Sequence, residues 1–194
     1  WFLERATKAP FYFSFLELPV ELADFEEQLS VSLDSNIRDQ NIMRAGYNDS
    51  AVSAEPRIIE RHDLTEGFLW RSYEFAADIA QTQEAISPYG PKSVFDAGFE
   101  HDGTEVIYSL PNGLLAFYAA DSTGKRVSSV LINSGAQTVP VQTTRDDASE
   151  LLLTESRPVL DAQPTPLTQT SFVGQTCMHC HKAGLIKRAD QMAE

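Results

Sequence analysis

Residues 105–120 read EVIYSLPNGLLAFYAA, and this stretch predicts a β-hairpin. From Val106 to Leu110, large apolar side chains alternate with the residues between them, which is the period of a half-buried strand. Asn112 and Gly113 tolerate the positive φ angles of a tight turn. The sequence therefore predicts two antiparallel strands that are joined at this Asn-Gly turn.

Other short segments with the same period of two flank the hairpin. They are rich in β-branched and aromatic residues, and turn residues such as Asp121-Ser122-Thr123-Gly124 separate them. We expect the strand after the hairpin to continue it into an antiparallel meander. The predicted strands are Arg57–Arg61, Phe68–Phe75, Glu105–Leu110, Leu114–Ala120 and Val127–Ile132.

The first third of the chain has helical periodicity instead. Apolar residues recur at intervals of three and four between Leu18 and Leu29, and Pro19 suits a first helical turn. A second helix is predicted over Asn36–Ala45, because Gly46 follows it directly. Both segments have the pattern of packing elements.

Beyond the strands, the sequence loosens from Ser134 to Gln169 and contains four prolines. Only Ala148–Glu155 has a helical pattern there. We therefore expect three parts: a helical and antiparallel β region over 1–133, a linker or strap over 134–170, and a C-terminal segment over 171–194.

The C-terminal segment holds the only two cysteines of the chain, in the run Cys177-Met178-His179-Cys180-His181. This C-x-x-C-H spacing is typical of covalent haem attachment. On a helix, sulfurs three positions apart share a face and can form thioethers with the two vinyl groups of one haem, while His181 coordinates the iron. We predict that helix over Phe172–Lys182, capped by Ser171 and ended by Gly184.

Other chemistries fit the two cysteines less well. A thioredoxin-like dithiol needs a βαβ context, which does not precede Cys177. A zinc site needs two further ligands, which only His62 and His101 could supply, because the adjacent His179 and His181 would strain a tetrahedron. A disulfide would close too short a loop to stabilise the chain much. The sequence therefore predicts haem c as the cofactor.

The sixth iron ligand is less clear from sequence than the fifth. His62 and His101 are both predicted candidates, and a neighbouring acid, Glu60 or Asp102, could instead satisfy either ring. Met178 and Met192 are weaker candidates, because of their position between the thioethers and near the chain end. The haem propionates need cations, for which we predict Arg57 and Arg61, with Lys182, Lys187 and Arg188 as further candidates.

The composition of the chain limits the kinds of molecule that it can bind. The chain has 194 residues, 28 acidic against 15 basic, and a net charge of −13. This balance argues against nucleic acid and favours basic redox partner proteins or a larger complex. No apolar run is long enough to span a bilayer. The chain begins at Trp1 rather than methionine, so we expect it to be part of a longer polypeptide.

Six segments together resemble a family of exported bacterial proteins known as cytochrome-c-like. Thr104 departs from that pattern, where a second glycine is usual, and so does Tyr108-Ser109, where the family has Phe-Asn. The resemblance implies export to the periplasm or cell exterior and haem attachment, but no substrate. The matching segments are Arg44–Asn48, Arg57–His62, Trp70–Phe75, Phe99–Gly103, Leu110–Leu114 and Cys177–His181.

Three functions compete at this stage. The first is a c-type cytochrome that transfers single electrons. The second is a haem peroxidase or oxidase with an open distal site, in which His101 or Glu100 acts as acid-base catalyst. The third is a sensor, in which the β meander holds a ligand and the haem reports it. The predicted fold for all three is α+β, with N-terminal helices, a central antiparallel meander and a C-terminal haem-binding helix.

Overall fold

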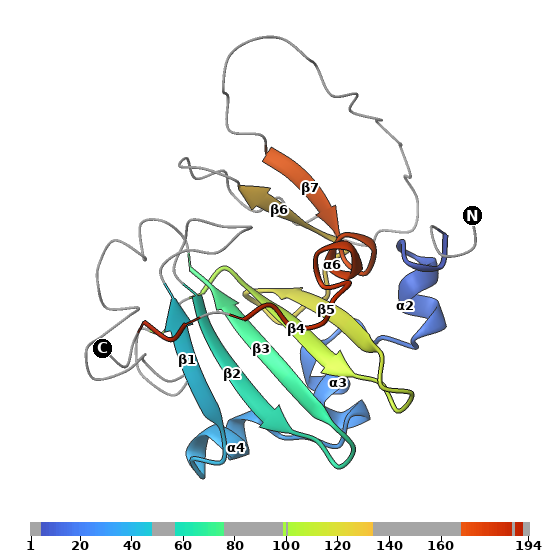
Figure 1. Ribbon diagram of the computed structural model, residues 1–194. Coiled ribbons are helices and arrows are strands. Elements are labelled where there is room, and N and C mark those ends of the chain that lie inside the picture. Colours follow the sequence, from blue (N-terminus) through green and yellow to red (C-terminus); the bar gives the residue numbers. More distant parts are fainter. Residues whose placement is uncertain are drawn as a thin grey trace, which may run out of the picture.

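The computed structural model has a five-stranded antiparallel sheet with short helices on it, an α+β arrangement (Figure 1). It describes residues 5–47, 57–75, 99, 101–133, 168–187 and 189–191. The described helices and strands, in chain order, are α2 (Phe11–Phe15), α3 (Leu22–Gln28), α4 (Leu33–Arg38), β1 (Met43–Tyr47), β2 (Arg57–Asp63), β3 (Phe68–Glu74), β4 (Gly103–Ser109), β5 (Leu115–Asp121), β6 (Ser129–Asn133), β7 (Thr168–Phe172) and α6 (Gln175–Cys180).

The large sheet is a simple meander in the order β1-β2-β3-β4-β5. The hairpin between β4 and β5 is confirmed, with Ser109 opposite Leu115. Gly113 has a φ of 80°, and the Asn112 side chain accepts a hydrogen bond from the Leu114 amide at 3.0 Å. The Asn-Gly pair therefore forms the turn in the way the sequence predicts.

Side-chain alternation gives the sheet two different faces. One face, the helix side, carries Ile58, Tyr73, Val106 and Tyr118 in the paired register, and it is buried. Helices α3 and α4 cover this side (Figure 1). Phe25 of α3 is fully buried and stacks on Tyr118, with ring centroids 4.4 Å apart. Part of the main core therefore lies between the helices and this face, and the core continues through Phe117 and Ala119, which point to the opposite face.

The other face, here called the motif side, carries Arg57, Trp70, Ile107 and Phe117. The C-terminal segment after α6 crosses this side of the sheet toward β1 (Figure 1). It ends in contact with Gly46, whose amide donates to Asp190 Oδ1 at 3.0 Å and whose carbonyl accepts from the Gln191 amide at 2.8 Å. These bonds occupy part of the free edge of β1.

Two helix predictions are partly wrong. The first predicted helix, Leu18–Leu29, is the shorter α3, because Glu21 is extended and bridges to Lys125. The second, Asn36–Ala45, is wrong beyond Arg38, because Met43–Tyr47 forms strand β1 instead. Pairing with β2 overrides the local helical preference there, since it gives the backbone a full ladder of hydrogen bonds.

Two predictions near the C-terminus also need correction. The strand after the hairpin leaves the meander, because β6 pairs with β7 in a separate two-stranded sheet. Since β7 includes Phe172, the predicted helix over 172–182 shrinks to α6, and its N-cap is Gly174 rather than Ser171. The predicted helix over 148–155 and residues 134–167 of the predicted linker lie outside the described residues.

The fold predicts a specific role for Tyr12 of α2. Its buried hydroxyl accepts from the Phe117 amide at 2.8 Å and donates to the Phe117 carbonyl at 3.2 Å, at the edge of β5. Tyr12→Phe should lower the free energy of unfolding by about 1 to 3 kcal/mol, because it leaves both buried backbone groups without a partner. Chemical denaturation measures this change.

Tyr108→Phe is the matched control. Tyr108 is as buried as Tyr12, and its hydroxyl makes no hydrogen bond with any residue in the described part of the chain. Its removal should change stability by less than about 0.5 kcal/mol. Equal losses in the two variants would contradict the role given to Tyr12.

Candidate functional site

Both cysteines of the C-x-x-C-H run lie on α6, and His181 follows as its C-cap. Val173, just before α6, is buried in the main core, so the motif is anchored on the same core as the sheet. Gly174 begins the helix with a φ of 95°, and a Cβ there would lie 2.7 Å from the Thr7 carbonyl oxygen. Only glycine fits this close approach, which brings α6 against the N-terminal region.

The His181 ring is held on the motif side of the sheet. Its centroid lies 5.7 Å from that of Phe117, whose side chain points to the face opposite Tyr118. Nδ1 of His181 lies 3.2 Å from the Gly184 carbonyl oxygen. If Nδ1 carries the proton and donates it to this carbonyl, Nε2 is left as a lone-pair donor. Histidines that coordinate metals in proteins are usually fixed by such a second contact.

The two thiols differ in their surroundings. Cys177 is half-buried and packs against the main core, whereas Cys180 is exposed. Burial, together with the nearby Glu105 carboxylate, raises the pKa of the Cys177 thiol to about 12. A reactive redox cysteine has a lowered pKa instead, so this environment is unlike that of a thioredoxin-type dithiol.

These residues fit a haem. The porphyrin itself supplies four iron ligands, so the protein needs to add only one or two, and His181 is the residue that the sequence predicts for one of them. A zinc ion would need a fuller set of protein ligands. Among the described residues, no group of three or more His, Cys, Asp or Glu side chains is placed to hold a metal ion. Apolar side chains on the motif side of the sheet and in the segment after α6 are incompletely buried: Trp70, Ile107, Leu115, Leu185 and Ile186.

The predicted sixth ligands lie on the other side of the sheet. His62 is fully buried on the helix side, in register with Leu69, and its Nδ1 lies 3.4 Å from the Asn36 amide nitrogen of α4. His101 packs edge-on against Tyr73, which is also on the helix side. The structure therefore does not bring either histidine together with His181.

The two arginines predicted for the propionates are on the motif side, but both already have carboxylate partners. Arg57 is buried between Glu74 and Glu105, with the Glu105 contact at 2.6 Å. Arg61 pairs with Asp63 at 2.5 Å and is more exposed. Both side chains lie on the same face of the sheet as the C-x-x-C-H run. Neither of them contacts this run in the described structure.

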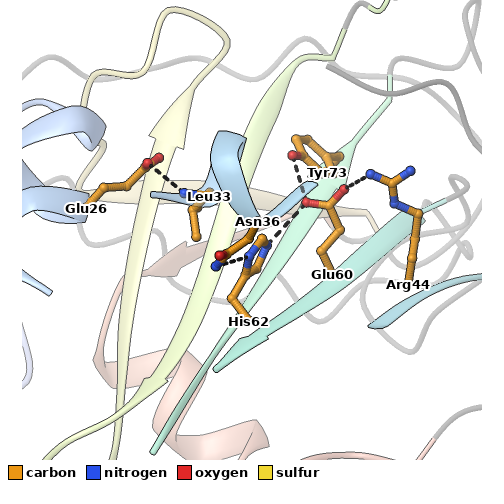
Figure 2. Close-up of polar contacts among 7 residues, drawn as sticks. All are labelled: Glu26, Leu33, Asn36, Arg44, Glu60, His62 and Tyr73. Carbon is orange, nitrogen blue, oxygen red and sulfur yellow. Dashed lines mark hydrogen bonds and ion pairs between the residues drawn. The ribbon is translucent and has the colours of Figure 1, made fainter. Parts of the chain in front are cut away.

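A buried polar cluster on the helix side surrounds His62, and it includes Glu60, the neighbouring acid that the sequence offered as an alternative partner for this ring (Figure 2). Glu60 is 1% exposed and accepts hydrogen bonds from Arg44 at 2.5 Å and from Tyr73 at 3.0 Å. His62 Nε2 lies 3.5 Å from the same carboxylate, a contact too long to be a good hydrogen bond. No local pattern of the sequence indicated the other members of the cluster, which are Asn36, Arg44 and Tyr73.

The surroundings of Glu60 fix its charge. Burial alone would raise the pKa of the carboxyl group, but His62, Arg44 and Tyr73 together hold this pKa below its ordinary value. Glu60 is therefore an anion in the folded protein, and its negative charge is shared among three partners. Such a carboxylate stabilises the fold at pH values above the pKa that it has in the unfolded chain. This stabilisation is lost as the pH falls through the lower pKa that it has in the folded protein.

Comparison with family models, with curated proteins and with solved structures finds no match for this chain. The resemblance to cytochrome-c-like proteins therefore stays a hypothesis. In the described part of the chain, no helix is both long enough and apolar enough to cross a membrane.

The Glu60 cluster gives a prediction with a defined pH dependence. Glu60→Gln should lower the free energy of unfolding at pH 7 by about 3 kcal/mol, because the charge of Arg44 loses its buried carboxylate partner. The difference from the wild type should shrink as the pH falls below about 4.5, the ordinary pKa of glutamate, because the wild-type carboxylate then loses its advantage.

Urea denaturation at several pH values measures both quantities. Glu66→Gln is the control, since Glu66 is exposed in the turn between β2 and β3 and its change should stay within about 0.5 kcal/mol. A stability loss for Glu60→Gln that is the same at pH 4 and pH 7 would contradict the assignment of a buried carboxylate.

Proposed function

We propose that this chain is a c-type cytochrome. Cys177 and Cys180 hold the haem through thioethers, and His181 coordinates the iron. The observation that carries the proposal is the His181 ring, whose Nδ1 meets the Gly184 carbonyl at 3.2 Å directly after the two cysteines. Haem, when bound, supplies a one-electron iron couple, and the polypeptide needs no further chemistry to transfer electrons.

The environment of α6 supports this proposal. The exposed thiol of Cys180 and the half-buried thiol of Cys177 lie one helical turn apart, so one planar cofactor can reach both. The adjacent motif side of the sheet has half-exposed apolar side chains, among them Trp70 and Ile107, which a porphyrin would cover. Covering them would remove apolar surface from water and stabilise the loaded protein.

Attachment of this kind is made outside the cytoplasmic membrane in bacteria, so we propose a periplasmic or extracellular location.

The charge near the motif also bears on the redox partner. Residues 162–189 contain no aspartate or glutamate, and Lys182 and Lys187 are exposed there, although the whole chain carries −13. The negative charge of the whole chain attracts basic partner proteins from a distance, whereas the part of a partner that touches this segment would carry acidic side chains.

A second function is supported by the position of the histidines. Since His62 and His101 lie across the sheet from His181, no histidine of the described chain outside the motif faces the iron site. An iron with an open sixth position would bind small ligands or peroxide, as in a haem sensor, peroxidase or oxidase. The spin state of the iron separates this function from simple electron transfer.

The proposal predicts covalent haem. The chain should be produced in a bacterial periplasm together with a cytochrome maturation system, and then run on a denaturing gel stained for haem peroxidase activity. The wild-type band should stain, and the double variant Cys177→Ser with Cys180→Ser should not. His179→Ala should keep the stain, because His179 is exposed and makes no contact that the proposal uses. An unstained wild-type band alongside a stained standard cytochrome would reject the proposal.

The placement of the histidines gives a further prediction. His62→Ala and His101→Ala should leave the visible spectrum and spin state of the loaded iron unchanged, because the sheet separates both rings from His181. His181→Ala, the positive control, should change them. Conversion of the iron to the high-spin form in either of the first two variants would show that the ring reaches the iron, and the sidedness described here would then be wrong.

A further inference from the structure

Arg71 of β3 is buried without a hydrogen-bond partner. It is 7% exposed on the helix side of the sheet, and its buried Nε atom has no hydrogen-bond partner among the residues that the structure describes. Its Cζ lies 4.6 Å from the centroid of the Tyr73 ring, so the cation rests on an aromatic face. Buried cations normally have an anionic partner, because an unpaired charge loses its hydration without compensation.

Neighbouring carboxylates do not fill this role. Glu60 is directly across from Arg71 in the pairing of β2 and β3, but it is already occupied by Arg44 and Tyr73. Glu26 of α3 acts on Arg71 only through its field, and its carboxylate accepts a hydrogen bond from the Leu33 amide. Neither carboxylate accepts a hydrogen bond from Arg71 Nε, so this donor remains available to a ligand.

A second polar group beside Arg71 is also unpartnered. Thr104 is 2% exposed, and its hydroxyl has no hydrogen-bond partner in the described structure. It faces Tyr73 across the β3 and β4 pair, on the same side as Arg71. Arg71 pairs with Val106, two residues further along β4, so Arg71 and Thr104 are diagonal neighbours, within reach of one small ligand.

Aromatic rings also pack around Tyr73. Phe99 lies 5.2 Å and His101 5.4 Å from the Tyr73 ring centroid, both nearly perpendicular to it. Phe75 joins the same cluster through Phe99. Burial and the charge of Arg71 lower the pKa of His101, so its ring is neutral at neutral pH. Two unpartnered donors are thus combined with an apolar aromatic wall.

We propose that Arg71 and Thr104 bind the carboxylate of a small organic acid, whose apolar body packs against Tyr73, Phe99 and His101. A guanidinium recognises a carboxylate through two parallel hydrogen bonds, and a hydroxyl can donate a third. This site lies on the opposite side of the sheet from α6. It does not depend on the haem, so it stands or fails separately from the proposed function.

Thermal unfolding of the chain with added benzoate, acetate or phosphate tests this site. Benzoate at about 10 mM should raise the Tm of the wild type by several degrees, since a ligand bound only by the folded state stabilises it. Acetate should raise it less, because it lacks the apolar body. Stabilisation by phosphate alone would overturn the assignment to an organic carboxylate, and no response to any of the three would overturn the site.

Arg71→Met gives a second and independent readout. Methionine matches the length of the arginine side chain without its charge, so the variant should lose the benzoate response. In ligand-free buffer it should be more stable than the wild type, because it removes an unpaired buried cation. A purely structural Arg71, stabilised by the Tyr73 ring, predicts the opposite sign, and a less stable variant that still responds to benzoate would overturn the proposal.

Arg61→Met is the matched control. Arg61 is on the motif side, where it pairs with Asp63. The variant should keep the full benzoate response. Loss of the response in this variant as well would assign the effect to general charge and would overturn the site at Arg71.

Discussion

Consecutive side chains of a β-strand point to opposite faces of the sheet. In this protein, that alternation determines which side chains can lie close to one another. Each strand of the meander is paired residue by residue with the next strand, so a residue lies on the same face of the sheet as its partner. The helix side is closed by Phe25 and its neighbours on α3 and α4. The motif side receives α6 and the segment that crosses to Gly46. Every candidate residue therefore belongs to one side or the other.

This division organises the chemistry of the molecule. The two cysteines and His181 are on the motif side, where Phe117 contacts the imidazole. The buried ionic cluster of Glu60 and the unpartnered Arg71 are on the helix side. A sheet of backbone and packed side chains lies between them, so a direct bond from His62 to an iron held by His181 is not possible without unfolding β2.

The sequence predicted best those elements whose structure depends on contacts between neighbouring residues. The turn at Asn112 and Gly113 and the strands around it depend on neighbouring residues, and they were found at the right positions. Strand β1 was missed, because its pairing partners lie on β2, ten or more residues along the chain. The length of α6 was overestimated for the same reason, since the pairing of β7 with β6 takes Phe172 out of the helix. Long-range pairing leaves no clear local pattern.

The candidate site was also predictable only where its residues are close together in the sequence. The spacing of Cys177, Cys180 and His181 is a local signal, and the structure adds the Gly184 carbonyl that orients the imidazole. Which face a distant histidine occupies depends on register, and for this reason the sequence could not show that His62 and His101 both lie across the sheet from His181. The isolation of Arg71 is a property of packing alone, because it depends on the prior pairing of Glu60 with Arg44 and Tyr73.

The central claim is that both cysteines carry one haem. The absorption spectrum of the reduced, pyridine-treated and alkaline-denatured protein tests it most directly, because its α band depends on how many vinyl groups of the porphyrin remain. The account predicts the band of a haem with both vinyl groups converted to thioethers, and the band of an intermediate haem after Cys177→Ser or Cys180→Ser. A band with both vinyl groups intact in the wild type would contradict it.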